Sequence, residues 1–392
     1  MVLEGIRVVE LAMWVAGPSA GGVMADWGAD VIKVEAPGGD PQRRVFNAIG
    51  LAVETVPPFE LDNRGKRSVV LDLRTEEGRE AMARLVATAD VFLTNLRMEA
   101  LERLGLDHAT LRARQPRLVY ALVTGYGLEG PERHRPGYDI GAFWARSSMA
   151  AAIVPKDEMP PHFRSGVGDH VTGITTVGGI MAALFERERT GEGRLVSTSL
   201  LRAGIYTMGW DIGIFLRFNR IQSARHRTRF TAPLLNSYRA GDGKAFYLIG
   251  LEQDRHWPGV IAAIERPDLA GDPRFATAPE RVKECEALIA ELDEIFASRP
   301  RDEWAAAFDA NDVWWAPINT IADVVVDPQA IAAGAFVDMP VVDGEPPYRA
   351  VASPVDFDGV RHPGRHVPAV GEHTDEILRE LGLAHEPPFR AS

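Results

Sequence analysis

Short hydrophobic runs that are typical of strands alternate with helical patterns through the first 200 residues. The runs lie at 6–11, 30–35, 68–72, 91–94, 118–123 and 195–200. Helical patterns lie between some of them, at about 19–28, 76–89 and 170–188. Strands that alternate with helices form βαβ units, and their strands then pair in parallel. The chain is therefore expected to be an α/β protein with a mostly parallel sheet.

The sequence changes character after about residue 225. A hairpin pattern with Gly-Asp-Gly at its turn covers 236–250, and helical patterns follow near 255–265, 279–297 and 301–310. We therefore predict a Rossmann-like large domain and a smaller α+β domain. The predicted boundaries are 1–200 for the large domain, 201–224 for a linker, 225–330 for the small domain, and 331–392 for a return segment. From about residue 335 this segment completes the large domain, and it contains a last helical pattern at 374–383.

The composition is that of an ordinary globular protein, with 46% hydrophobic and 25% charged residues. No apolar run approaches the roughly 18–20 residues that span a bilayer. The first residues lack the pattern of a signal peptide, and the single cysteine, Cys285, excludes an internal disulfide. These features predict a cytoplasmic protein that does not bind membranes. A net charge of −12 argues against non-specific binding to nucleic acid.

One segment combines a carboxylate with glycines at the start of a long helix. Gly166-Val167-Gly168-Asp169-His170 precedes the helical pattern at 170–188 and places Asp169 at or next to the helix N-cap. One interpretation is structural, because aspartate is a favoured capping residue. The other is catalytic: the positive end of the helix keeps a carboxylate ionised, and the glycine N–H groups are able to hold an oxyanion. The residues alone leave both interpretations open.

Six passages are similar to those of a known family and occur in the family's order. They are VVELAMWVAGPSAGGVMADWGADVIKVEAPGGD, NRGKRSVVLDLRTEEG, ALERLGL, GYGLEGPERHRPGYD, GDHVTGITTVGGIMAALFERERTGEG and GEHTDEILRELGL. On these passages the chain resembles the class III CoA transferases of the CaiB/BaiF type. This superfamily includes formyl-CoA transferases and α-methylacyl-CoA racemases.

The resemblance implies an acyl-CoA:carboxylate CoA transferase in which Asp169 is the catalytic nucleophile. The reaction would be a ping-pong transfer through a mixed anhydride and an aspartyl-CoA thioester. Its substrates would be an acyl-CoA donor and a carboxylic acid acceptor. The alternative is an α-methylacyl-CoA racemase or another CoA-ester isomerase. Racemases use a histidine where this chain has Tyr138, and a phenol with a pKa of about 10 is a poor base near neutral pH.

The resemblance also implies a set of residues that contact CoA. They are Val15, Ala16, Leu71, Asp72, Leu73, Arg74, Thr94, Asn95, Leu96, Arg103 and Tyr138. The dinucleotide motif G-x-G-x-x-G is absent because Pro18 and Ser19 follow Gly17, so NAD is not expected. No His/Cys cluster has the spacing of metal ligands, so no metal is expected either. His170 is interpreted as a supporting residue rather than a catalytic one.

Two departures from the family pattern bear on substrate binding. The family commonly places a basic residue directly after the glutamate of the second strand, where this chain has Ala36; Arg43 or Arg44 is a candidate replacement. The glycine run of formyl-CoA:oxalate transferases is absent from 225–262, so oxalate and formate are not expected as substrates.

The acyl pocket is only weakly specified by the sequence. The candidates for its wall are Trp14 and Trp144, with Arg146 as a possible contact to the acceptor carboxylate. By resemblance alone, the active form would be a homodimer of interlocked chains.

Overall fold

The computed structural model describes residues 1–51, 53, 55–221, 223–340 and 347–383. They form two compact units. The first comprises the described residues within Met1–Ala150, Pro161–Ile221 and Ala332–Ser392. The second comprises those within Ala151–Pro160 and Gln222–Ile331.

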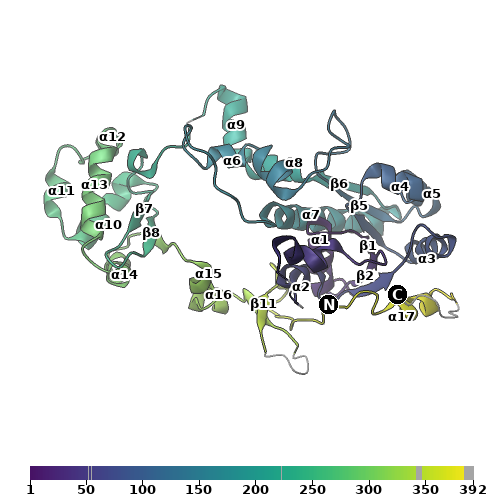
Figure 1. Ribbon diagram of the computed structural model, residues 1–392. Coiled ribbons are helices and arrows are strands. Elements are labelled where there is room, and N and C mark those ends of the chain that lie inside the picture. The colour runs from purple at the N-terminus through teal and green to yellow at the C-terminus, as the bar shows by residue number, and fades with distance from the viewer. Residues whose placement is uncertain (52, 54, 222, 341–346, 384–392) are drawn as a thin grey trace. The chain divides into compact units, whose positions relative to one another are not determined.

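A six-stranded parallel sheet forms the centre of the first unit (Figure 1). In spatial order its strands are β3 (Arg67–Val70), β2 (Asp30–Glu35), β1 (Arg7–Leu11), β4 (Val91–Thr94), β5 (Val119–Thr124) and β6 (Leu195–Ser199). Val8 of β1 is in register with Val31 on one side and with Val91 on the other. The predicted α/β fold is therefore confirmed. The strand order reverses between β1 and β4, and ligands of such sheets bind outside the carboxyl ends of the strands at that point.

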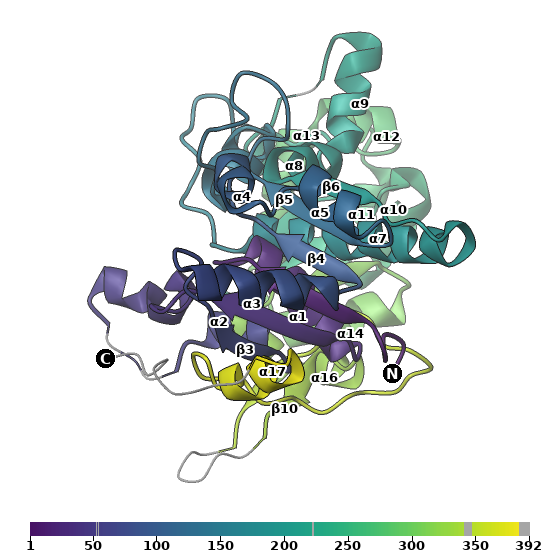
Figure 2. The ribbon, with the colours of Figure 1, turned by 90° about the vertical axis from the view of Figure 1, so that its right-hand side faces the viewer.

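Helices cover both faces of the sheet. Successive residues of a strand point to opposite sides, and apolar side chains on both sides need a layer of helices to bury them. Val8 belongs to a core that it shares with α1 (Ala16–Asp26) and α7 (Val167–Thr190). Val9 belongs to the core on the opposite face. The helices of that face are α3 (Glu76–Ala87), α4 (Met98–Leu104), α5 (His108–Arg114) and α17 (Thr374–Glu380), as Figure 2 shows.

The return segment closes the β3 edge of the sheet. The N–H of His373 donates to the Ser68 carbonyl at 2.9 Å, and the N–H of Val70 donates to Oγ1 of Thr374 at 3.1 Å. Arg67 forms ion pairs with carboxylates of α17. An edge strand with free N–H groups is a template for pairing with another chain. Here those groups are satisfied from within the same chain.

The second unit is built on a three-stranded antiparallel sheet, in the order β7 (Ser237–Arg239), β8 (Ala245–Leu248), β9 (Trp315–Pro317). Phe246 and Phe296 pack with their ring centroids 5.1 Å apart inside its core. Its helices are α10 (Gln253–Ile264), α11 (Pro267–Gly271), α12 (Ala278–Lys283), α13 (Cys285–Phe296) and α14 (Arg301–Ala310). The single helix predicted over 279–297 is wrong, because Glu284 separates two helices there.

The remaining elements are short and connect the larger ones. They are η1 (Pro41–Ile49), α2 (Pro57–Asn63), η2 (Asp139–Ala145), α6 (Met149–Ala152), α8 (Leu200–Thr207), α9 (Gly209–Phe218), η3 (Arg227–Arg229), α15 (Ile321–Val324), α16 (Pro328–Ala332), β10 (Phe336–Asp338) and β11 (Arg349–Val351). Within the described part of the chain, no helix combines the length and the apolar character that crossing a membrane requires.

Candidate active site

A cavity of about 450 Å³ opens at the carboxyl ends of β1 and β4, where the strand order reverses. Asp169 of α7 lies in its wall, so we call it the Asp169 cavity. Six other predicted site residues line it: Trp14, Val15, Ala16, Asn95, Leu96 and Tyr138. The fold thus brings together residues that are up to 155 positions apart (169 minus 14).

A second cavity of about 530 Å³ shares Met13 and Leu96 with the first. We call it the Leu71 cavity. Its wall contains Leu71, Asp72, Leu73 and Arg74, which follow β3. Most of the predicted contact residues therefore line one of two adjoining cavities in the first unit.

Asp169 lies in the first turn of α7 and not at its N-cap. The N-cap is Gly166, whose φ of 86° is accessible to glycine at low cost, and the helix begins at Val167. The sequence predicts Asp169 at or next to the N-cap, whereas the structure places it inside the first turn of the helix. The side chain of Asp169 is free of a capping role and faces the cavity.

Asp139, in η2, holds the start of α7. Its Oδ1 accepts a hydrogen bond from the N–H of Gly168 at 3.2 Å. A Cβ at position 168 would lie 2.4 Å from that oxygen and 2.2 Å from Cγ of Phe143, so only glycine fits. The expectation that the glycine N–H groups are available to an oxyanion is wrong for Gly168, because Asp139 occupies that donor.

The carboxyl group of Asp169 is easier to protonate than an ordinary aspartate. Burial, followed by the negative charge of Asp139, raises the pKa of Asp169 to about 7. His170 acts in the opposite direction, and Asp62 adds a smaller upward effect. The expectation that the helix terminus keeps Asp169 fully ionised is therefore wrong, because burial and a neighbouring carboxylate outweigh it.

Trp14 has an unusual backbone conformation that the cavity wall depends on. Its φ is 65°, a region that bulky residues rarely adopt, and its N–H donates to Oδ1 of Asp40 at 3.1 Å. Its ring meets that of Tyr138 edge to face at 6.1 Å. Asp40 thus holds in place the aromatic pair beside Asp169.

Two predicted contact residues stabilise the strand ends instead of presenting free polar groups. The Asn95 side chain accepts from the N–H of Met13 at 3.0 Å and donates to its carbonyl at 2.7 Å. Thr94 Oγ1 donates to the Leu11 carbonyl at 2.8 Å. These bonds fix the loops after β1 and β4, where both cavities meet.

Residues 3–374 match the family model of CoA-transferase family III. The chain belongs to this family. It is 33% identical, over 98% of its own length and 94% of the relative's, to the cinnamoyl-CoA:phenyllactate CoA-transferase of Clostridium sporogenes. It is 34% identical to the succinate–glutarate CoA-transferase of Agrobacterium fabrum, over 97% and 95% of the two lengths. The resemblance inferred from the sequence is confirmed, and the protein is a CoA-transferase.

A solved structure of the same family has the same architecture. The CaiB/BaiF family protein from Brucella suis superposes with a TM-score of 0.85 at 33% identity. The match covers 97% of this chain and 99% of that one. The family membership therefore extends to the arrangement of the strands and helices that form the two cavities.

Three predicted residues of the family site have other surroundings. Arg103 is an exposed residue of α4, and it is not among the described residues that line either cavity. Trp144 stacks on Phe163 at 4.3 Å. Arg146 pairs with Glu132 and lies over the ring of Tyr126.

The Asp169 cavity also contains basic residues that the sequence interpretation missed. They are Arg97, Arg133, His134 and Arg135. Three of them form the run RHR directly before Pro136, inside a passage already used for the resemblance. A run of cations near a glycine-rich turn is a usable sign of a site for anionic groups.

Proposed function

We propose that this CoA-transferase exchanges CoA between an acyl-CoA and a free carboxylic acid, with Asp169 as the covalent nucleophile. The main observation is the position of Asp169: its carboxylate lies in the wall of a cavity at the point where the strand order reverses. The named activities of the relatives support the reaction class.

The proposed reaction needs no external proton donor. The Asp169 carboxylate attacks the thioester carbonyl of the donor, the C–S bond breaks, and CoA leaves as a thiolate. The thiolate then attacks the Asp169 carbonyl of the mixed anhydride, and the donor acid leaves as a carboxylate. The acceptor carboxylate attacks the resulting aspartyl-CoA thioester and expels the thiolate. The thiolate takes the acceptor acyl group from the second anhydride and frees Asp169.

We assign the nucleotide part of CoA to the Leu71 cavity and the thioester to the Asp169 cavity. The two cavities share Met13 and Leu96, so one extended ligand is able to occupy both. Glu35, which in dinucleotide-binding folds would meet a ribose, is fully engaged here. It accepts from Arg43 at 2.7 and 2.9 Å, from Ser68 at 2.6 Å and from the N–H of Asp40 at 2.8 Å.

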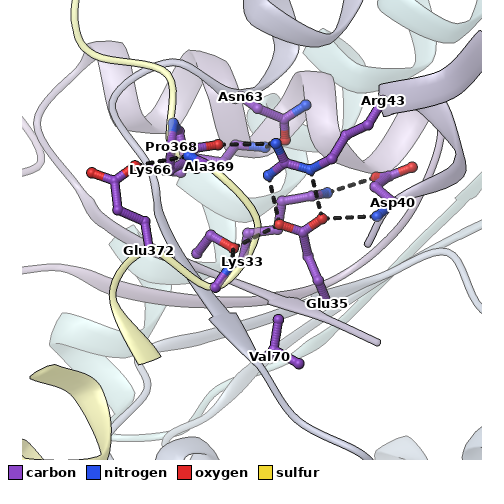
Figure 3. A network of polar contacts seen from close by, with 12 residues as sticks. Lys33, Glu35, Asp40, Arg43, Asn63, Lys66, Val70, Pro368, Ala369 and Glu372 are labelled. Atoms are coloured by element: carbon purple, nitrogen blue, oxygen red, sulfur yellow. Dashed lines mark hydrogen bonds and ion pairs between the residues drawn. The ribbon is translucent and has the colours of Figure 1, made fainter. Parts of the chain in front are cut away.

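Arg44 is the better of the two proposed replacements for the basic residue missing at Ala36. Arg43 is held by Glu35 and by the Pro368 carbonyl (Figure 3). Arg44 donates to the carbonyl of Gly38, which lines the Leu71 cavity, at 2.7 Å. Among the described residues no carboxylate forms an ion pair with Arg44, so its charge is available to a phosphate.

Arg44→Gln is expected to raise KM for acyl-CoA about tenfold, because it removes one charge-assisted hydrogen bond and a tenfold loss of affinity corresponds to the free energy of such a bond. The value of kcat should change little, because the guanidinium is remote from Asp169 in the proposed arrangement. Steady-state kinetics with CoA and dephospho-CoA thioesters measure both quantities. Arg84→Gln, which removes an exposed arginine paired with Glu80, is the control. Equal KM values for Arg44→Gln and Arg84→Gln would contradict the assignment.

The proposed function is tested with a panel of acyl-CoA donors and free acids. The acids include aromatic 2-hydroxy acids and short dicarboxylic acids, the classes named for relatives. We expect CoA transfer without ATP, and hydroxylamine or borohydride should trap Asp169 as a modified residue that mass spectrometry locates. Exchange of the α-deuterium of a 2-methylacyl-CoA, with no acceptor acid and no transfer, would favour the racemase alternative.

We also propose that the active form is a homodimer. Helix α9 has no buried residue, and it exposes Trp210 (84%) and Leu216 (81%). Tyr206 of α8 is 87% exposed nearby in the sequence. Exposed apolar surface of this kind is typical of interfaces between protein chains.

Replacing both Trp210 and Leu216 with glutamate is expected to halve the mass in solution, because buried carboxylates destabilise an apolar interface. Light scattering coupled to gel filtration measures the mass. The control is Val2→Glu, which adds one negative charge at another exposed apolar position. A double variant that keeps the mass of the wild type would show that α9 is not the interface.

A further inference from the structure

A buried carboxylate contacts the residue that follows the nucleophile. Oδ1 of Asp62, in α2, lies 3.0 Å from Nε2 of His170. The side chain of Asp62 is only 2% exposed, whereas that of His170 is 44% exposed. A buried carboxylate without a cationic partner is costly, and His170 supplies such a partner at the entrance of α7.

Asp62 is held rigidly on its other side. Its Oδ2 accepts from Nε2 of Gln42 at 2.9 Å, and the Gln42 N–H donates to Oδ1 of Asp40 at 2.9 Å. Asp40 also accepts the N–H of Trp14 and pairs with buried Lys33 at 2.8 Å, as Figure 3 shows for Asp40 and Lys33. One chain of polar contacts therefore joins His170 to the backbone of Trp14 in the wall of the Asp169 cavity.

The backbone of Asp62 is equally constrained. A Cβ at position 22 of α1 would lie 2.7 Å from the Asp62 carbonyl oxygen, so α2 packs directly on the glycine surface of α1. The carboxylate cannot follow His170 if the imidazole moves, which makes Asp62 a fixed point.

We propose that Asp62 and His170 form a positioning pair that holds a cationic imidazole beside the nucleophilic carboxylate of Asp169. This inference rests on the proposed function, because it assigns a task to the pair in that reaction. His170 is a positioning residue: its positive charge favours the ionised form of Asp169, which attacks the thioester.

The charges around the nucleophile agree with this task. The hydrogen bond from His170 to Asp62 is the main cause that raises the pKa of His170, so the ring holds its proton to a higher pH. The groups that shift the pKa of Asp169 by their charge are Asp139, His170 and Asp62, in decreasing order. The other charged residues on helices packed against α7 are Asp26, at the far end of α1, and Arg202 of α8.

The order of these effects predicts graded shifts in the pH profile of kcat/KM. The acid limb of the wild type reports the ionisation of Asp169 and should lie near its pKa of about 7. His170→Gln removes the cation but leaves the charge of Asp62, so the limb should move to higher pH. Asp62→Asn weakens the positive charge of His170, because the ring then loses its proton more easily, and it removes the negative charge of Asp62 as well. The two changes act in opposite directions on the pKa of Asp169, so the shift has the same sign as in His170→Gln and is smaller. Asp139→Asn should move the limb to lower pH.

The activity of His170→Gln should return at high pH, where Asp169 is ionised without the charge of His170. His170→Gln should lose about tenfold in kcat/KM at pH 6, which corresponds to one pKa unit, and approach the wild type near pH 9. A purely structural role would lower the rate by the same factor at every pH. That outcome, or an unshifted acid limb in His170→Gln, would overturn the inference.

A second measurement does not depend on catalysis. NMR of the histidine rings should show a lower pKa for His170 in Asp62→Asn than in the wild type, because the hydrogen bond to that carboxylate is lost. The control is Glu372→Gln, which removes the carboxylate 2.9 Å from His366 and should leave His170 unchanged. An unchanged titration of His170 in folded Asp62→Asn would overturn the pair. If Asp62→Asn does not fold, the exposed substitution His170→Gln decides by its pH profile.

The two proposals fail in different ways. If no acid accepts CoA and Asp169 is never trapped in the wild type, the proposed function is wrong while the ring titration still reports on the pair. If transfer occurs and the acid limb of kcat/KM is the same in the wild type and in His170→Gln, only the proposed positioning pair is wrong.

Discussion

Asp169→Asn is expected to lower the rate of CoA transfer by roughly 10⁴-fold or more, the scale seen when a covalent nucleophile is removed. The amide does not form the mixed anhydride, so no later step of the exchange is accessible. Binding of acyl-CoA should persist, because the Leu71 cavity is intact. Transfer kinetics and calorimetric titration with a CoA ester measure the two effects separately.

The control for this substitution is Asp302→Asn. Asp302 also lies in the first turn of a helix, α14, but its side chain is 82% exposed. It should retain the full rate. Transfer by Asp169→Asn within about tenfold of the wild type would exclude Asp169 as the nucleophile, since even the loss of one electrostatic group in an active site costs roughly 10²–10³-fold.

Glu10→Gln is expected to lower the free energy of unfolding of the first unit by about 3–5 kcal/mol, the cost of breaking a buried ion pair. The Glu10 carboxylate lies 3.1 Å from Nζ of Lys33 and 2.7 Å from Nζ of Lys66, and all three side chains are fully buried. Burial lowers the pKa of Lys66 to about 8 even with Glu10 present. Without that carboxylate Lys66 loses its ion-pair partner, and Lys33 keeps only its pair with Asp40 among the described residues.

Urea unfolding of the wild type and the variant measures this difference. The matched control is Glu376→Gln, which breaks an ion pair of Arg67 at the surface and should cost less than about 1 kcal/mol. Equal losses for Glu10→Gln and Glu376→Gln would show that the buried cluster does not stabilise the unit. The crowding supports a large effect, because a Cβ on Gly21 would lie 1.9 Å from Oε2 of Glu10.

The sequence predicts the central sheet well because burial on both faces leaves a strong pattern. Runs such as Val119 to Val123 and Val91 to Leu93 are continuously apolar, as expected for parallel strands between two layers of helices. The apolar spacing likewise predicts the long helix that carries Asp169, whereas the role expected of Asp169 comes from the resemblance to the family. Both predictions depend on local signals that extend over several residues.

The surroundings of Asp169 are not predictable in this way. Asp62, Asp139 and His170 come from three different elements, and two of these, α2 and η2, have seven residues each and no periodic pattern. Their effect on the pKa of Asp169 depends on distances that arise only when the chain folds. The expectation of an ionised carboxylate failed for this reason, because it considered the helix terminus without the neighbouring charges.

The return segment has a consequence for the order in which the protein is made. Thr374 and Gly371 complete the hydrogen bonding of β3, and the carbonyl of Pro368 holds Arg43 beside Glu35 in the wall of the Leu71 cavity. A ribosome must therefore release nearly the whole chain before strands made from the first 70 residues reach their final partners. During synthesis the unpaired edge of β3 is a place where chaperones are expected to bind, and the Leu71 cavity is among the last parts of the protein to form.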